Sequence, residues 1–448
     1  MATVLSTSQA TPLSSTTVSP QGVSAHPPSR RLVSLDIVRG VAMVLMAIDH
    51  VRVYSGQPAG GPTPGIFFTR WVTNYSAPIF VFLAGTGAYL YGAKLGGAAG
   101  RRTLARWLLS RGAWLIFLEL TVLRFAWTFN FDYKHYSMAG VLWAIGWCMI
   151  LLGGLIFLPA TAIAAIGAVI VGGHNALDPH IPAIAERLSN SGSSWLWQIL
   201  YFGGGIDIYG STFIVLYSII PWVGVMALGY AFGAVMQLDA RERARWCYWI
   251  GGVAVATFLV FRAFDIYGDP RPWRPPTSAV TRANAASTAS ASAAPATPAQ
   301  TSAKPAAARP TMPSGLKFLA TTKYPASLLF LLMTLGPAIL AIPLLERTSG
   351  RLNKVLVVFG RVPFFFYLLH IPLIHLAAVV VSLIRTGQIS PWLFANHPTM
   401  NPPAPDGYIW SLPLLYLVWV IVVALLYIPC RWYADLKGRS RSAWLRYV

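Results

Sequence analysis

Apolar residues dominate ten stretches of the chain, and each stretch is long enough to cross the hydrocarbon core of a membrane. A spanning helix takes about 20 residues, with a range of roughly 17 to 25. The ten stretches lie near residues 33–54, 69–92, 104–123, 139–157, 159–175, 213–236, 246–265, 324–345, 355–382 and 408–430. The pattern predicts an all-α, polytopic integral membrane protein with about ten transmembrane helices. The fifth stretch, short and rich in Ala and Gly, carries the weakest signal.

Polar tracts bound and interrupt this apolar region. Residues 1–30 are rich in Ser, Thr and Pro and lack an apolar core, so we expect a disordered cytoplasmic tail and no cleavable signal peptide. Residues 276–313 are low in complexity, which indicates an insertion in an external loop. We therefore expect one transmembrane domain over residues 31–435, followed by a basic cytoplasmic tail over residues 436–448.

Charge supports the membrane assignment and sets an orientation. Charged residues make up 11% of the 448 residues, against about 25% in a typical soluble domain. The net charge is +20, and the basic residues gather in alternate short connections between the apolar stretches. This bias places those connections and both termini in the cytoplasm. We expect a multi-pass protein of the cell (inner) membrane whose basic residues contact anionic lipid headgroups, with no nucleic-acid partner.

Residues 35–50 of the first apolar stretch carry four ionisable side chains, Asp36, Arg39, Asp49 and His50. A charge inside a membrane costs a few kcal/mol or more, so it usually faces a protein interior or a watery cavity and marks a functional site. At about 100° per residue, one line along the helix holds Asp36, Gly40, Met43, Ala47 and His50. Arg39 lies near the edge of this line and Asp49 points elsewhere. We expect a track of small and soft side chains with His50 at its external end.

His50 is the main catalytic candidate, because imidazole titrates near neutral pH and serves as a general base or a nucleophile. His370 and His375 lie five residues apart in the ninth stretch, and so on opposite faces of a helix. Only one of them can share a cavity with His50, and we favour His370. The alternative use of either is donation to a carbonyl of a neighbouring helix. No HExxH, HxxxH or CxxC motif and no GxSxG serine elbow occurs, so we expect no metal.

Further polar residues gather where the predicted topology places the external ends of helices, close to His50. Arg124, Asn130 and Asp132 follow the third stretch, Asp269 follows the seventh and Lys323 precedes the eighth. An aromatic belt at the membrane surface accounts for the Trp and Phe residues among them. It does not account for the clustered polar groups, for which rigid loop ends with snorkelled side chains are the simpler alternative.

The pattern Leu35-Asp36-x-x-Arg39-Gly40-x-Ala42, with a histidine fourteen residues after the aspartate, resembles the first helix of transmembrane acyltransferases. The bacterial branch of the heparan-α-glucosaminide N-acetyltransferase-like family is the most similar group. The other segments that carry this resemblance are Trp143–Met149, Pro221–Tyr230, Tyr267–Pro270, Lys323–Leu328 and Phe359–Pro363. The resemblance covers roughly residues 31–435 without the low-complexity tracts.

One feature departs from the family pattern. The lysosomal acetyltransferase of this family has Asn at the position of His50 and its active-site histidine in the loop that follows. The corresponding loop of this chain, Gly60–Gly65, contains no histidine. A catalytic His50 is instead similar to the pattern of the O-acyltransferases that modify bacterial surface polysaccharides.

The resemblance implies a transmembrane acyltransferase that takes acetyl-CoA or another acyl-CoA from the cytoplasm and acylates a hydroxyl or amine of an external glycan-like acceptor. His50 would be catalytic, and Asp36 with Arg39 would shape the donor entrance. The other supporting residues would be Asp49, Arg124 and His370, and the substrate-binding residues would be Asn130, Asp132, Trp143, Asp269 and Lys323. The expected partners are the lipid bilayer, acyl-CoA and the acceptor, and the sequence allows a homodimer.

A proton-coupled transporter of a small solute is the alternative, with the intramembrane Asp, Arg and His residues as a proton relay. Two related halves with broken helices would favour it, and the sequence has no such internal symmetry. A structural scaffold is the third option, and it leaves the charged line of the first helix without an explanation.

Overall fold

The computed structural model describes residues 32–61, 63–190, 192–274, 313–395, 397, 402–440 and 442. This part of the chain is mostly helical, with one small sheet. The prediction of a helical protein is therefore confirmed. The predicted tail over residues 1–30 and, apart from its last residue, the insertion over residues 276–313 lie outside the described residues. The helix α17 (Leu412–Arg439) continues into the segment predicted as the C-terminal tail.

Within the described residues, six helical runs are long and apolar enough to cross a membrane, and they indicate a membrane protein. These runs are Pro64–Leu95, Ala160–Leu188, Ala240–Phe264, Leu328–Leu345, Pro363–Thr386 and Leu412–Arg439. Two shorter apolar helices, α6 (Val141–Leu155) and α10 (Ile219–Val235), lie within predicted spans. The first and third predicted spans correspond to α1 (Val33–Ser55) and α4 (Gly97–Leu118), both of which carry several charged residues.

The runs contain several separate elements. The first comprises α2 (Pro64–Trp71), the 3-10 turn η1 (Val72–Tyr75) and α3 (Ser76–Leu95), and the second contains α7 (Ala160–Gly173), η3 (His174–His180) and α8 (Ile181–Asn190). The others are α11 (Ala240–Phe264), α14 (Leu328–Leu345), α16 (Pro363–Thr386) and α17. The short elements are η2 (Glu119–Leu123) and η4 (Gln198–Phe202), both π-helical, α5 (Arg124–Thr128), α9 (Ser194–Trp197), α13 (Ser314–Leu319) and η5 (Pro391–Phe394).

The predicted span over residues 355–382 is wrong at its start. Its first residues belong to a separate helix, α15 (Arg351–Arg361), and α16 begins at Pro363. Proline lacks a backbone N–H and disfavours the helical conformation of the residue before it, so the preceding helix ends there. Val362, with φ −131° and ψ 48°, makes the break.

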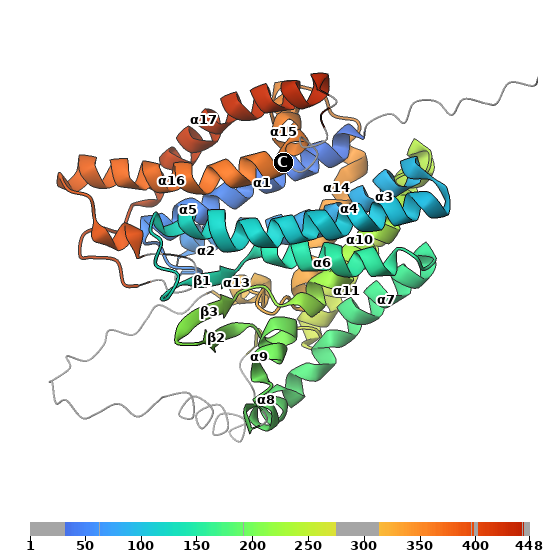
Figure 1. The fold of residues 1–448 in the computed structure, drawn as a ribbon, viewed down its shortest axis with the longest axis horizontal. Helices are drawn as coiled ribbons and strands as arrows, with labels where there is room; N and C mark the ends of the chain where they lie inside the picture. The colour runs from blue at the N-terminus through green and yellow to red at the C-terminus, as the bar shows by residue number, and fades with distance from the viewer. Residues whose placement is uncertain are drawn as a thin grey trace, which may run out of the picture. The chain divides into compact units, whose positions relative to one another are not determined.

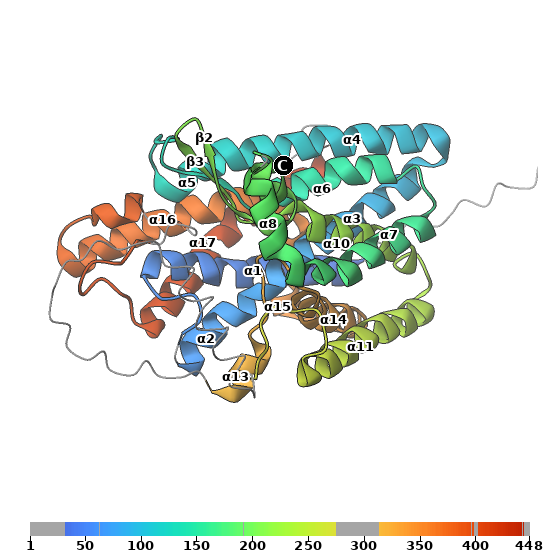
Figure 2. The same ribbon diagram turned by 90° about the horizontal axis from the view of Figure 1, so that it is seen from below.

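The helix α1 lies at the centre of the packing. It contacts α3 and α14 as well as α15, α16 and α17. In Figure 1 its axis has roughly the same direction as the axes of α4, α6 and α16. Other close pairs are α3 with α10, α7 with α10, α4 with α6, and α11 with α14, the last of which Figure 2 shows side by side. Asp36 and Arg52 of α1 are buried. The charged residues of α1 thus face protein.

Glycines permit the closest helix crossings. A Cβ atom on Gly360 of α15 would lie 1.7 Å from the backbone oxygen of Asp36, and one on Gly40 would lie 2.0 Å from that of Leu356. Small residues allow such an approach of two backbones inside membranes, where lipid provides little hydrophobic drive for helix association. Similar approaches occur at Gly85 with Gly229 and at Gly112 with Gly146. The expected track along α1 is therefore filled by α15 at Gly40.

A three-stranded sheet lies beside the start of α6. Its order is β1–β3–β2, in which β1 (Ser137–Ala139) is parallel and β2 (Gly204–Ile208) antiparallel to β3 (Ser211–Val215). Ser137 pairs with Phe213. A buried cluster joins the sheet to α6 through Ala139, Trp143, Ile206 and Val215. The sheet thus fixes the start of α6 and the chain that leads into α10.

Candidate functional site

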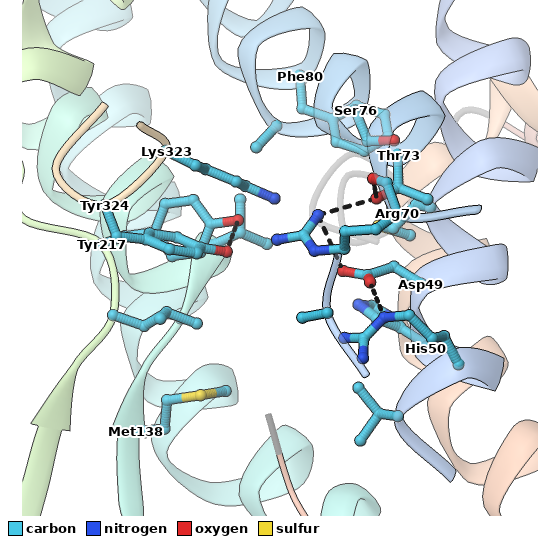
Figure 3. A pocket seen from close by; sticks show the side chains of 18 of the residues that line it. Asp49, His50, Arg70, Thr73, Ser76, Phe80, Met138, Tyr217, Lys323 and Tyr324 are labelled. Carbon is cyan, nitrogen blue, oxygen red and sulfur yellow. Dashed lines mark hydrogen bonds and ion pairs between the residues drawn. The ribbon is translucent and has the colours of Figure 1, made fainter. Parts of the chain in front are cut away.

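A cavity of about 170 Å³ lies beside the end of α1 that carries Asp49 and His50. Its walls come from α1, the α2–α3 run, η2, α5, β1 with the start of α6, the residues between β3 and α10, the turn before α14, and α16. The charged and polar residues of these walls are Asp49, His50, Arg52, Arg70, Thr73, Ser76, Glu119, Tyr217, Lys323, Tyr324 and Tyr367. Figure 3 shows side chains from distant parts of the sequence converging on this space.

Asp49 is the centre of an ion-pair network on one wall. Its carboxylate lies 2.8 Å from Arg52 Nε and 3.5 Å from Arg70 Nη1. Arg70 Nη1 also donates to Thr73 Oγ1 at 3.0 Å and to Asn74 Oδ1 at 3.1 Å. The sequence places Asp49 away from the line through His50, but the cavity is wide enough that both neighbouring residues line it.

His50 forms a hydrogen bond with His370 of α16. His50 Nδ1 lies 2.6 Å from His370 Nε2, and His370 Nδ1 lies 2.6 Å from the backbone oxygen of Tyr367. Since a carbonyl only accepts, a neutral His370 carries its proton on Nδ1 and accepts at Nε2 from His50 Nδ1. These tautomers are assigned from the network. They leave the lone pair of His50 on Nε2, the nitrogen that a general base would use.

His375 donates a hydrogen bond to a carbonyl of a neighbouring helix, the alternative role given above for the histidines of α16. Its Nδ1 donates to the backbone oxygen of Ala126 at 3.3 Å. Its ring stacks on Phe129, with centroids 4.0 Å apart, and on Tyr54. The sequence predicts that only one of the two histidines of α16 shares a cavity with His50. His370 bonds to His50 but is not part of the cavity wall, and His375 lies among other neighbours, because a separation of five residues turns the two side chains to different sides of the helix.

Lys323 reaches the cavity from the turn between α13 and α14, and Asp269 holds this turn in place. The Asp269 carboxylate accepts from the backbone N–H of Thr322 at 2.7 Å, from its hydroxyl at 2.8 Å and from Ser327 Oγ at 3.0 Å. Burial lowers the pKa of the Lys323 ammonium, and Arg70 lowers it further, whereas Tyr324 and Asp49 oppose the shift. Asp269 thus contributes to the cavity by positioning Lys323.

Arg124, Asn130 and Asp132 do lie together, but they hold a loop outside the cavity walls. Arg124 donates to Asn130 Oδ1 at 2.8 Å, to the backbone oxygen of Tyr136 at 3.0 Å and to that of Asp132. Asn130 Nδ2 donates to the backbone oxygen of Phe394 at 2.8 Å. Asp132 is exposed, and its hydrogen bond with His135 lowers the pKa of its carboxyl.

The remaining candidates lie elsewhere in the fold. Asp36 and Arg39 form an ion pair at 3.3 Å at the other end of α1, and Arg39 Nη2 lies 3.5 Å from the backbone oxygen of Leu83. Trp143 packs against the sheet in the buried cluster described above. Neither the ion pair nor Trp143 is part of the cavity wall.

The sequence comparison decides the family. The family model described as heparan-α-glucosaminide N-acetyltransferase, catalytic, matches residues 31–263, about half of the chain. The chain belongs to this family. Membership in the heparan-α-glucosaminide N-acetyltransferase family indicates a transmembrane acetyltransferase of a type that uses acetyl-CoA. A comparison with curated proteins gives no match.

The matched region of this family member contains only part of the cavity. It includes Asp49, His50 and Arg70, and it ends in α11, before Lys323 and His370. The cavity is therefore completed by the C-terminal half of the chain. Within the described residues, no group of three or more His, Cys, Asp or Glu side chains is arranged to hold a metal ion.

Sequence reasoning did not select several residues of the cavity wall. Arg70 carries a detectable signal, because the positive-inside rule disfavours a basic residue at an external helix end. Arg52 follows Asp49 by three residues, a spacing typical of helical ion pairs. Glu119 also carries one, because it is an acidic residue inside the predicted span over residues 104–123. Tyr217 and Tyr324 carry no such signal, since only the tertiary fold brings them to the cavity.

Proposed function

We propose that this family member transfers the acetyl group of cytoplasmic acetyl-CoA to a hydroxyl or amine of a glycan-like acceptor on the external side, with His50 as general base. The observation that carries the proposal is the hydrogen bond between His50 and His370 beside a cavity lined by charged and polar side chains. With Nδ1 engaged by His370, His50 can take a proton at Nε2. General-base catalysis of this kind typically contributes about 10²- to 10⁴-fold in rate.

The proposed reaction is a direct acyl transfer. The acceptor oxygen or nitrogen attacks the carbonyl carbon of the thioester while its proton passes to His50 Nε2. The carbon–sulfur bond then breaks, and His50 returns the proton to the departing thiolate. The negative charge of Asp49 on the same wall favours the transient imidazolium. Cationic residues of the wall are suited either to stabilise the oxyanion or to position the acceptor.

The cavity size limits what it can hold. At about 170 Å³ it is smaller than the roughly 300–1,000 Å³ of pockets that enclose a whole drug-sized ligand. We place only the thioester and the acceptor nucleophile there. Because α15 fills the face of α1 at Gly40, we place the donor arm between α1 and α3, past Arg39 and Leu83. About 17 Å of helix separates Arg39 from His50, a length that suits an extended arm.

We also propose a ten-helix topology with both termini in the cytoplasm of the inner membrane. The spanning elements would be α1, α2–α3, α4, α6, α7, α10, α11, α14, α16 and α17, within a domain over residues 31–435. The basic residues at the start of α4 and α11 support this orientation. The amphipathic helix α15 would lie at the cytoplasmic face.

Donor binding tests this proposal. Purified protein should bind acetyl-CoA in calorimetry, and Arg39→Ala should weaken binding about 10- to 100-fold, the value of a charge-assisted hydrogen bond. Arg102→Ala is the matched control, because Arg102 is exposed on α4. Acceptor binding should change much less in either variant.

The alternative function gives the opposite results. A proton-coupled transporter would show no heat with acetyl-CoA and would take up a solute into liposomes along a proton gradient. These two results together would contradict acetyl transfer and would show that the protein is a transporter. Equal weakening of donor binding by Arg39→Ala and Arg102→Ala would contradict the entrance assigned to Arg39.

A further inference from the structure

A groove of about 750 Å³ runs along α11, the helix that packs beside α14. Only 22% of the apolar window of α11 is buried, and Figure 2 shows this helix on the outer side of α14. The groove is separate from the cavity beside His50, because the two share no lining residue. Its volume falls within the roughly 300–1,000 Å³ of pockets that hold a ligand.

One face of α11 forms most of the groove wall and changes from basic to apolar along the helix. At intervals of four residues, the groove is lined by Arg245, Trp249, Val253 and Thr257. Residues at this spacing lie on one side of a helix. At about 1.5 Å per residue, the stripe is about 18 Å long, close to the thickness of one leaflet, which is half of a hydrocarbon core of about 30 Å.

The basic end of the groove carries an excess of positive charge. Arg241 precedes Arg245 by one helical turn, and both side chains are exposed. Two nearby carboxylates have other partners: Asp239 accepts from the first backbone N–H groups of α11, and Glu346 binds Arg243 at 2.8 and 3.0 Å. In the part of the chain that the structure describes, no carboxylate lies within 4.0 Å of the Arg241 or Arg245 guanidinium.

We infer that the groove binds an anionic phospholipid of the cytoplasmic leaflet, with its phosphate at Arg241 and Arg245 and an acyl chain along Trp249 and Val253. The proposed topology places the start of α11 at the cytoplasmic face, where basic pockets between spanning helices bind anionic headgroups. Guanidinium groups match the geometry of phosphate oxygens. Trp side chains are typical of the boundary between headgroups and hydrocarbon. The inference does not depend on acetyl transfer.

A second copy of the chain fits the groove less well. Helices associate in membranes through small residues, and α11 already uses Gly251 against α14, where an added Cβ would lie 2.8 Å from the backbone oxygen of Gly336. The groove instead presents Trp249, which is 66% exposed. A two-fold contact would also bring the same arginines of both copies together, and like charges repel each other.

Native mass spectrometry of the full chain in detergent tests the inference with two lipids that share their acyl chains, dioleoyl phosphatidylglycerol and dioleoyl phosphatidylcholine. Each basic residue near an anionic headgroup contributes about 5-fold, so we expect the wild type to bind phosphatidylglycerol about 30-fold more tightly. The double variant Arg241→Gln/Arg245→Gln should bind both lipids equally. Arg101→Gln/Arg102→Gln is the matched control, because this pair is exposed at the start of α4, outside the groove.

A second pair of variants tests the path of the acyl chain. Val253→Trp fills the groove and should weaken the binding of both lipids about 10-fold, the value of roughly two buried CH₂ groups. Leu259→Trp, at an exposed position of α11 outside the groove, should leave both affinities unchanged.

Three results would overturn the site. Equal wild-type affinities for the two lipids would exclude recognition of the anionic headgroup. An equal loss in both arginine pairs would show a general attraction of the basic face. A dimer without bound lipid that Val253→Trp dissociates would show that the groove holds a second copy of the chain.

Discussion

Replacing His50 by Ala should lower acetyl transfer about 10²- to 10⁴-fold, the contribution expected of a general base. The hydrogen bond with His370 directs the lone pair of His50 to Nε2, and no other histidine of the described chain lines the cavity. Membrane insertion and thermal stability should stay close to those of the wild type, because His50 is only half-buried. Transfer of labelled acetyl groups by purified protein measures the effect.

Two further variants make this result specific. His50→Gln keeps a donor toward His370 but cannot accept a proton, so it should be as inactive as His50→Ala. His180→Ala removes an exposed histidine of η3 and should leave the rate unchanged. Substantial activity in both His50 variants would place the base elsewhere, and His370 would then be the next candidate.

Among the substitutions proposed for this protein, Gly360→Leu should lower the free energy of unfolding the most. Even a Cβ atom at this position would lie 1.7 Å from the backbone oxygen of Asp36, and a backbone cannot yield as a flexible side chain can. Overpacking typically costs about 1–3 kcal/mol, and this contact should lie at or above the upper end. Since the crossing holds α15 against α1, its disruption should also disturb the end of α1 that carries Arg39.

Thermal unfolding of protein in detergent, followed by tryptophan fluorescence, measures this loss. Gly172→Leu on α7 is the matched control, because no side chain or distant backbone lies within 4 Å of a Cβ at that position. An unfolding temperature that falls equally in both variants, or in neither, would contradict the assigned role of the α1–α15 crossing.

Hydropathy predicts the helices well because each membrane span must bury its backbone polar groups in its own hydrogen bonds. It fails where a local rule overrides it. The ninth apolar stretch divides at Pro363, because proline stops α15 and starts α16. The pattern also does not distinguish a binding track from a packing surface, and at Gly40 the small residue serves packing.

The sequence predicts part of the candidate site. The part that it does not predict depends on tertiary contacts. His50 and His370 are 320 residues apart, yet intramembrane polarity and helix spacing select both. The clustering of Arg124, Asn130 and Asp132 is also predicted, but their hydrogen bonds turn inward to hold a loop. Helical periodicity places Asp49 away from the line through Asp36 and His50, although Asp49 lines the cavity. Periodicity gives only the angle of a side chain around α1, and it carries no information on the width of the cavity.

An acetyl-transfer assay with the two substrates on opposite sides of a liposome membrane tests whether the protein transfers acetyl groups across the membrane. The three native cysteines, Cys148, Cys247 and Cys430, are buried, and Tyr209 is fully exposed at the β2–β3 turn, so an impermeant thiol reagent on Tyr209→Cys reports which face of a liposome is external. Labelled acetyl-CoA is then supplied on one side and an impermeant amino sugar on the other. We expect acetylated sugar only when acetyl-CoA is on the side opposite Tyr209 and the sugar is on the side of Tyr209. Acetylation that requires both substrates on one side, or equal acetylation in either arrangement, would contradict transfer across the membrane through His50.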